Sequence, residues 1–299
     1  MRVPSLVVLA VTLVACGPAE TPKKKSTARA EEVEADSGSP FGADPHFKPK
    51  AFHVEVTGEG RPIIFIPGLG CPGEVWDGTV VHMTDNGYQA HVLTLAGFAD
   101  QPPINEPLSA AVRRDLTRYI RSRGLDHPVI VGHSMGGFIA YWIASYHPEL
   151  VGPTIIVDAG PALSGDIDVA KSLRARWKYA SDEEFLGLIR GAFFSMTNMR
   201  KRMEKTVDLI VKSDRLAIGN AIFEMVVTDL SDKVNEIQAP VLVIAADGGY
   251  QYKIKQQAEP IPDHEFVVLP HTRHFVFYDD PEAFYKVVDK FLADHPPKS

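Results

Sequence analysis

The chain has 299 residues, of which 45% are hydrophobic, and its formal net charge is −7. A chain of this length can bury one large core, which favours a single domain with an insertion over two independent domains. The body carries no long basic stretch, so nucleic acid is excluded as a partner. The two cysteines, Cys16 and Cys71, are too few for a disulfide framework.

The first residues have the layout of an export signal. Arg2 supplies the charged start, residues 6–14 form a short apolar run, and small residues precede Cys16. The apolar run is too short to span a bilayer as a stable helix. A signal peptide is therefore predicted at residues 1–15.

The end of this signal carries a more specific motif. Leu13-Val14-Ala15-Cys16 resembles the lipobox of bacterial lipoproteins, in which cleavage before the cysteine is coupled to lipidation of its sulfur. This resemblance implies acyl chains, such as palmitate, on Cys16 and attachment to the bacterial cell envelope. Gly17 follows the cysteine, which in a Gram-negative host implies the outer membrane, facing the periplasm. A plain signal peptide that happens to contain a cysteine is the alternative.

Residues 16–45 have the composition of a linker. They are rich in proline, serine and charged residues and include three consecutive lysines at 23–25. Almost nothing in this stretch could enter a core, so a disordered tether is expected there. The folded domain is then expected at residues 46–299.

The body alternates between strand and helix patterns. Continuous apolar runs predict strands that are covered on both faces, as in a parallel sheet, and a period-two run predicts a half-buried strand at 52–56. Strands are predicted at 52–56, 62–66, 89–95, 129–131, 153–157, 240–246 and 265–269, and clear helices at 108–121 and 281–292. This alternation indicates an α/β fold with a mostly parallel sheet.

The most informative stretch is Gly132-His133-Ser134-Met135-Gly136. A β-branched run enters it and a buried helix leaves it, so Ser134 stands at the apex of a tight turn between strand and helix. Side chains at Gly132 or Gly136 would collide with the flanking elements. The turn exposes Ser134 and directs N–H groups at the helix start towards whatever the serine attacks. This context favours a nucleophile elbow over an ordinary Gly-Ser turn.

On these residues, the sequence from about 52 to 293 resembles the α/β-hydrolase family. The resemblance implies a mostly parallel central sheet flanked by helices, with a helical cap inserted before the penultimate strand. The pattern does turn helical at 161–238. The resemblance also identifies the loop Pro67-Gly68-Leu69-Gly70 as an oxyanion loop, so that the backbone amides of Leu69 and Met135 would bind the oxyanion.

A serine hydroxyl is a poor nucleophile at neutral pH unless an imidazole takes its proton. His274 follows the last predicted strand and leads into the closing helix, in the order serine, acid, histidine that the family uses. His271 is a competitor that comes earlier in the same loop. His133, inside the elbow, is expected to turn away from Ser134 and to be structural.

Two residues compete for the acid. Asp247 follows the strand at 240–246, the family's usual place, but the usual Gly-x-x-Asp spacing is absent. Asp158 directly follows the strand at 153–157, which is the known alternative position in the family. The Val-Asp and His-Phe runs resemble those of capped members and slightly favour Asp158. Either carboxylate would orient the imidazole and stabilise the imidazolium.

The helical stretch is rich in large soft side chains, which predict either plain core or an apolar acyl pocket. They are Phe185, Leu186, Leu188, Ile189, Phe193, Phe194, Met196, Met199, Ile222, Phe223 and Met225. A small-molecule acyl substrate with an apolar part is expected. No His, Cys or Asp cluster has ligand spacing, so neither a metal nor an organic cofactor is expected.

The predicted function is that of a carboxylesterase-like serine hydrolase, which cleaves an ester, a thioester or a related acyl bond through an acyl-enzyme. A peptidase, a lactonase or a C–C hydrolase would use the same triad. The alternative from another class is a non-catalytic, envelope-anchored binding protein with a hydrolase fold.

Overall fold

The computed structural model describes residues 46–163 and 166–297. The signal peptide, the lipidated Cys16 and the tether predicted for residues 1–45 lie outside the described residues.

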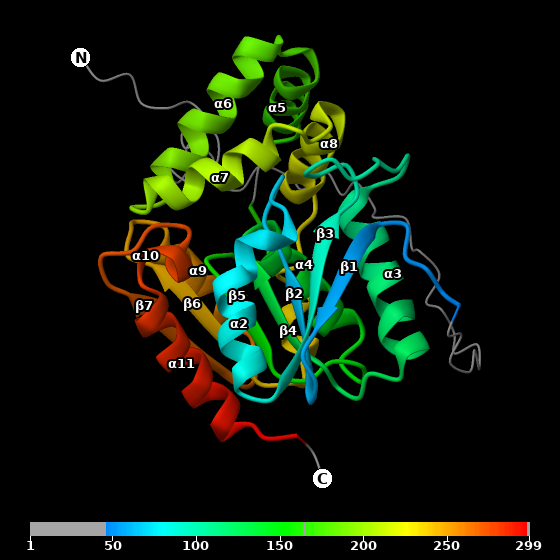
Figure 1. Cartoon of the computed structure of the whole chain (residues 1–299), viewed down its shortest axis with the longest axis vertical. Coiled ribbons are helices and arrows are strands. Elements are labelled where there is room, and N and C mark those ends of the chain that lie inside the picture. The colour runs from blue at the N-terminus through cyan, green and yellow to red at the C-terminus, as the bar shows by residue number, and fades with distance from the viewer. Residues whose placement is uncertain (1–45, 164–165, 298–299) are drawn as a thin grey trace.

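Seven strands form one sheet in the order β1-β3-β2-β4-β5-β6-β7 (Figure 1). They are β1 (Phe52–Thr57), β2 (Arg61–Ile66), β3 (Tyr88–Leu95), β4 (Val129–His133), β5 (Thr154–Val157), β6 (Val241–Ala246) and β7 (His264–Leu269). Only the pair β1 and β3 is antiparallel among the strands of this sheet; every other neighbouring pair is parallel. The predicted mostly parallel sheet is confirmed.

The register of the central strands brings three loops together. Ile66 at the end of β2 pairs with Gly132 of β4, and His133 of β4 pairs with Val157 at the end of β5. Strands β4 and β5 are buried along their whole length, as their unbroken apolar runs require. The carboxyl ends of β2, β4 and β5 therefore meet at one edge of the sheet, where ligands bind in open α/β folds.

Helices cover both faces of the sheet (Figure 1). Helices α2 and α11 lie on one face, and α3 and α4 lie on the other. The helices outside the stretch between β5 and β6 are α2 (Asp77–Asp85), α3 (Leu108–Arg123), α4 (Met135–Tyr146), α9 (Gln251–Ala258), α10 (Val276–Asp279) and α11 (Pro281–Asp294), with a short 3₁₀ turn η1 (Gly73–Trp76). A second 3₁₀ turn, η2 (Val234–Glu236), lies shortly before β6. No helix in the described ranges is long and apolar enough to cross a bilayer.

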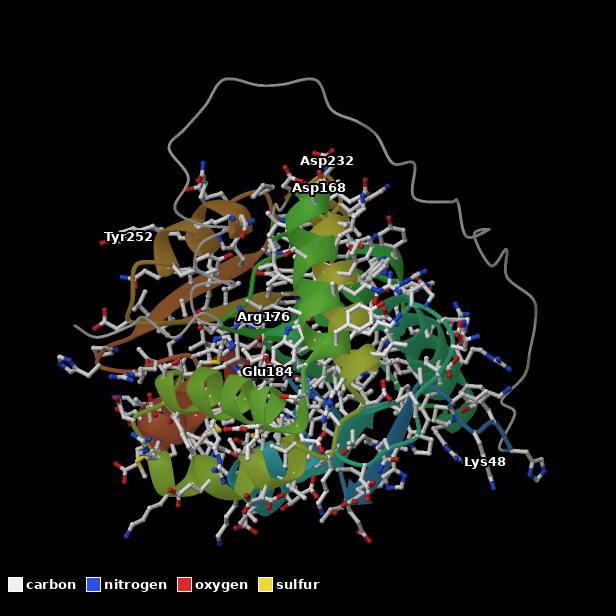
Figure 2. The ribbon with its side chains drawn as sticks, turned by 90° about the horizontal axis from the view of Figure 1, so that it is seen from above. Lys48, Asp168, Arg176, Glu184, Asp232 and Tyr252 are labelled. Carbon is white, nitrogen blue, oxygen red and sulfur yellow. The ribbon has the colours of Figure 1, made fainter. Side chains whose placement is uncertain are left out.

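Among the described residues between β5 and β6 there are four α-helices, and we call residues 167–227 the helical insertion. They are α5 (Ile167–Tyr179), α6 (Asp182–Ser195), α7 (Arg200–Ile210) and α8 (Arg215–Val227). The insertion lies beyond one end of the sheet (Figure 1), and Figure 2 looks down on it, with Asp168 and Arg176 marking α5 and Glu184 marking α6. The turn before α8 contacts loops at the carboxyl ends of β2 and β3: the Ser213 hydroxyl donates to the Gly70 carbonyl over 3.3 Å and accepts from the Ala99 amide over 2.9 Å.

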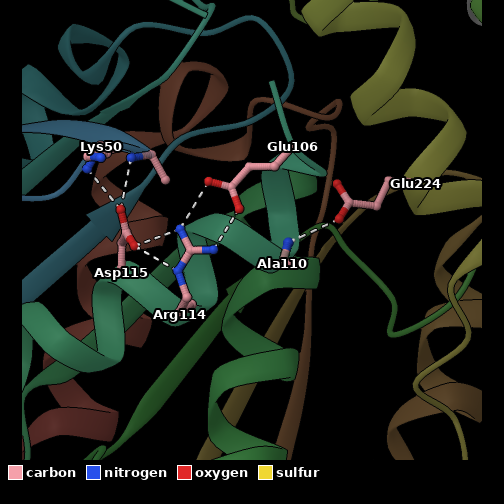
Figure 3. A network of polar contacts seen from close by, with 7 residues as sticks. Lys50, Glu106, Ala110, Arg114, Asp115 and Glu224 are labelled. Atoms are coloured by element: carbon pink, nitrogen blue, oxygen red, sulfur yellow. Dashed lines mark hydrogen bonds and ion pairs between the residues drawn. The ribbon is translucent and has the colours of Figure 1, made fainter. Parts of the chain in front are cut away.

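A buried carboxylate ties the insertion to the body of the domain (Figure 3). Glu224 of α8 is 8% exposed and accepts hydrogen bonds from the amides of Ser109, at 2.7 Å, and Ala110, at 3.0 Å. Figure 3 marks the second of these bonds. The first amides of a helix have no partner within the helix, and the residue before α3 is Pro107, which offers no side-chain cap. A side chain of the insertion therefore caps a helix of the body.

The same figure shows how the chain before β1 is held. The Asp115 carboxylate of α3 accepts hydrogen bonds from the amides of Lys50, at 2.8 Å, and Ala51, at 3.1 Å (Figure 3). Arg114 bridges Asp115 and Glu106, at 2.9 Å and 2.6 Å. The first described segment is thus fixed to α3 by a charged network.

Candidate active site

Ser134 lies at the junction of β4 and α4 in a strained backbone conformation. Its φ is 55° and its ψ is −118°, a region that residues other than glycine rarely occupy. The Ser134 amide donates to the Val157 carbonyl over 3.0 Å, and the Ser134 carbonyl accepts from the Phe138 amide over 3.0 Å. The neighbouring strand and the helix therefore hold the turn from both sides.

The two elbow glycines are dictated by main-chain crowding. A Cβ atom at Gly136 would lie 2.1 Å from the carbonyl oxygen of Ile66, and one at Gly132 would lie 2.2 Å from the carbonyl oxygen of Gly136. Backbone atoms cannot give way as a flexible side chain could. Residues with a side chain at either position would separate β2, β4 and α4 and displace Ser134.

The loop after β2 runs directly beside the serine. A Cβ atom at Gly68 would lie 3.2 Å from the Cβ atom of Ser134, and the Cys71 amide closes the loop on the Gly68 carbonyl over 3.0 Å. Leu69 in this loop is half-buried, and Met135, which begins α4, is 1% exposed. The structure thus brings both residues predicted to donate to an oxyanion to the neighbourhood of Ser134.

The structure joins His274 to Asp158. The Nδ1 atom of His274 lies 2.6 Å from Oδ2 of Asp158, and the two side chains are 22% and 12% exposed. The other carboxylate oxygen, Oδ1, accepts a hydrogen bond from the Ala246 amide over 2.9 Å. The Asp158 amide donates to the Ile244 carbonyl over 2.7 Å. Both the carboxylate and its backbone are therefore fixed against β6.

Asp247 and His271, the alternatives to Asp158 and His274, bind each other instead of the pair of His274 and Asp158. Asp247 is exposed, and its Oδ2 atom accepts a hydrogen bond from the amide of His271, which is also exposed, over 3.1 Å. The contacts define the difference. The Asp158 side chain reaches both the Ala246 amide and His274, whereas Asp247, at the exposed position directly after β6, binds the loop before His274.

His133 supports the loop that carries His274. It is fully buried, and its Nε2–H donates to the main-chain carbonyl of His274 over 3.0 Å, with the two rings 4.5 Å apart. Burial, and secondarily the neighbouring His274, hold the pKa of His133 well below its ordinary value, so its ring is neutral. A structural role was predicted for His133, but its partner was not, because the contact joins residues 141 positions apart.

Two other kinds of site are a cysteine nucleophile and a metal centre. Cys71 is 1% exposed, and burial raises the pKa of its thiol, so it stays protonated and is a poor nucleophile. Within residues 46–163 and 166–297, no group of three or more His, Cys, Asp or Glu side chains could hold a metal ion.

A seven-stranded sheet of this order, with a serine elbow after its fourth strand and a histidine after its last, defines an α/β hydrolase fold. The chain belongs to the alpha/beta hydrolase family, whose family model matches residues 63–287.

Individual relatives are distant but cover most of the chain. The pimeloyl-acyl-carrier protein methyl ester esterase of Vibrio vulnificus is 21% identical over 253 residues, covering 78% of this chain and 94% of its own. The N-formylmaleamate deformylase of Pseudomonas putida is 24% identical over 259 residues, covering 82% of this chain and 92% of its own. The solved structure of a thermophilic esterase from Thermogutta terrifontis has a TM-score of 0.73 and 22% identity, covering 82% of this chain and 94% of that one.

Proposed function

We propose that this protein is a serine hydrolase of the carboxylesterase type, which cleaves an ester or thioester through an acyl-enzyme intermediate. The 2.6 Å contact between His274 and Asp158, at the same edge of the sheet as a serine held in a strained elbow, carries this proposal. Membership of the alpha/beta hydrolase family supports it, and so do relatives that are named as esterases.

In this mechanism each group has one task. Ser134 attacks the acyl carbon while the Nε2 atom of His274 takes the serine proton, and His274 then returns that proton to the leaving group. Asp158 accepts the Nδ1–H of His274, which fixes the tautomer and stabilises the imidazolium. The amides of Leu69 and Met135 bind the oxyanion, and water then releases the acyl group by the reverse sequence.

We further propose that the acyl part of the substrate is small to medium in size and apolar. Side chains of the insertion approach the oxyanion loop: a Cβ atom at Gly70 would lie 3.3 Å from Ile210 and 3.6 Å from Ile218. Leu69, which is half-buried, adds an apolar side chain from the same loop. Ile210 and Ile218 belong to the core cluster and Leu69 packs against it, and these three are the candidate pocket residues because they lie at the oxyanion loop.

We expect a fluorophosphonate probe to label the folded protein at one site, the peptide that contains Ser134, because such probes react only with activated serines. The readout is mass spectrometry of the digested protein, with heat-unfolded protein as the control. Labelled protein is then compared with unlabelled protein on p-nitrophenyl esters of graded acyl length. Failure of folded protein to label would favour the non-catalytic binding function, and equal rates along the ester series would contradict an apolar acyl pocket.

We also propose that the enzyme is anchored in the bacterial cell envelope through lipid on Cys16, a proposal that rests on the sequence motif alone. Cells grown with an alkyne analogue of palmitate are expected to label the wild-type chain and the Cys71→Ala variant but not Cys16→Ala. Cys71 is the matched control because it is the other cysteine of the chain and is buried in the domain. Equal labelling of all three proteins, or of none, would exclude the anchor.

A further inference from the structure

The loop that carries His274 is bound to the turn between α6 and α7. The Asn198 Nδ2 atom donates to the His271 carbonyl over 3.0 Å. The Arg273 guanidinium donates to the Ser195 carbonyl over 3.1 Å. The Phe275 amide donates to the Met196 carbonyl over 3.1 Å. Residues that precede and follow His274 in the sequence are therefore hydrogen-bonded to the insertion.

One carboxylate joins the two segments. Asp279 is the last residue of α10, and its Oδ1 atom accepts hydrogen bonds from the Thr197 hydroxyl, at 2.5 Å, and from the Asn198 amide, at 2.8 Å. Its Oδ2 atom accepts from the amide of Arg273, at 2.8 Å. One oxygen thus holds the insertion, and the other holds the residue that precedes His274. Hydrogen bonds to a carboxylate are stronger than bonds between neutral groups.

The backbone of His274 is held on both sides. Asp279 fixes the amide of the preceding residue, and His133 donates to the carbonyl of His274 itself. The imidazole must face Asp158 on one side and Ser134 on the other, and a displacement of about 1 Å in such a site can lower the rate about 100-fold. A small shift of the loop that carries His274 would therefore change the reaction rate more than the same shift of an ordinary surface turn.

We infer that Asp279 is a positioning residue, which holds the general base in place and couples it to the helical insertion. This inference rests on the proposed function. Asparagine at position 279 keeps the shape of the side chain but only one acceptor oxygen. Its NH₂ group must then face either the Arg273 amide or the donors from Thr197 and Asn198, so one of the two links is lost.

The test compares Asp279→Asn with Asp280→Asn in the full chain. Asp280 is the matched control because it loses the same charge at the next position, but its carboxylate only caps α11 by accepting from the Ala283 amide over 3.0 Å. Asparagine is also a good N-cap, so we expect this control to behave as wild type. For Asp279→Asn on a short p-nitrophenyl ester, we expect kcat to fall by about 10 to 100-fold while KM stays within about twofold.

The rate and the final extent of fluorophosphonate labelling separate positioning from folding. A slower rate with full final labelling supports the inference, because every molecule is folded but reacts slowly. A reduced extent of labelling at the wild-type rate, or an unchanged kcat, overturns it.

If Asp279→Asn does not fold, Thr197→Val serves instead, because it removes one bond to the same carboxylate. We expect this variant to lose less kcat than Asp279→Asn would, and an unchanged kcat overturns the inference. A wild-type protein without activity overturns the proposed function itself, whereas an active wild type with an equally active variant overturns only this inference.

Discussion

Ser134→Ala is expected to lower kcat on a p-nitrophenyl ester by about 10⁶-fold, because removal of the nucleophile from a serine triad leaves only the contribution of the oxyanion hole and binding. KM should change little, since the hydroxyl contributes chemistry rather than affinity. The measurement is steady-state hydrolysis at several substrate concentrations, with purification from a host that lacks background esterase activity.

The matched control for this variant is Ser145→Ala. Ser145 lies in the same helix α4, and its hydroxyl donates to the Tyr141 carbonyl over 2.8 Å, within the helix. Its removal should leave kcat close to wild type. If Ser134→Ala retained a tenth of the activity, another nucleophile would have to carry the reaction.

Asp158→Asn is expected to lower kcat by about 10⁴-fold, the effect of presenting the imidazole in the wrong tautomer. The structure gives the reason. The Ala246 amide donates to Oδ1 of Asp158 and would retain the oxygen of an asparagine, so the NH₂ group would face Nδ1 of His274. Nδ1 would then accept a hydrogen bond, and the proton would sit on Nε2, the atom that must receive the proton of Ser134.

Asp247→Asn is the control for this variant. Its carboxylate binds only the backbone amide of the exposed His271, so we expect little change in kcat. Both variants lose one charge from a residue that directly follows a strand. Equal losses in the two variants, or a large loss in Asp247→Asn alone, would contradict the assignment of Asp158 as the triad acid.

The sheet and the elbow could be predicted from the sequence because both depend on local signals. Each strand is a continuous or alternating apolar run, and Ser134 is flanked by glycines where the main chain is crowded. The choice between Asp158 and Asp247 is different in kind. Both residues follow strands, at two positions that the family uses for the acid, and only the packing of distant loops decides that Asp158 contacts His274 while Asp247 binds the His271 amide.

Contacts between distant segments could not be predicted either. His133 reaches the carbonyl of His274 across 141 positions, and Asp279 reaches Thr197 across 82. No periodicity in the sequence links such pairs. The apolar side chains of the insertion posed a similar problem, because helical spacing alone does not distinguish Phe185, which is buried in the core, from Ile210, which also approaches the oxyanion loop.

The backbone of Ser134 also bears on how such a chain could evolve. A residue other than glycine held at a φ of 55° costs about 1–3 kcal/mol, against a total free energy of unfolding of about 5–15 kcal/mol for a typical domain. Glycine at this position would relieve that strain in a single substitution. A chain selected only to bind a ligand would therefore become more stable by losing the serine, whereas a hydrolase must retain it and tolerate the lower stability.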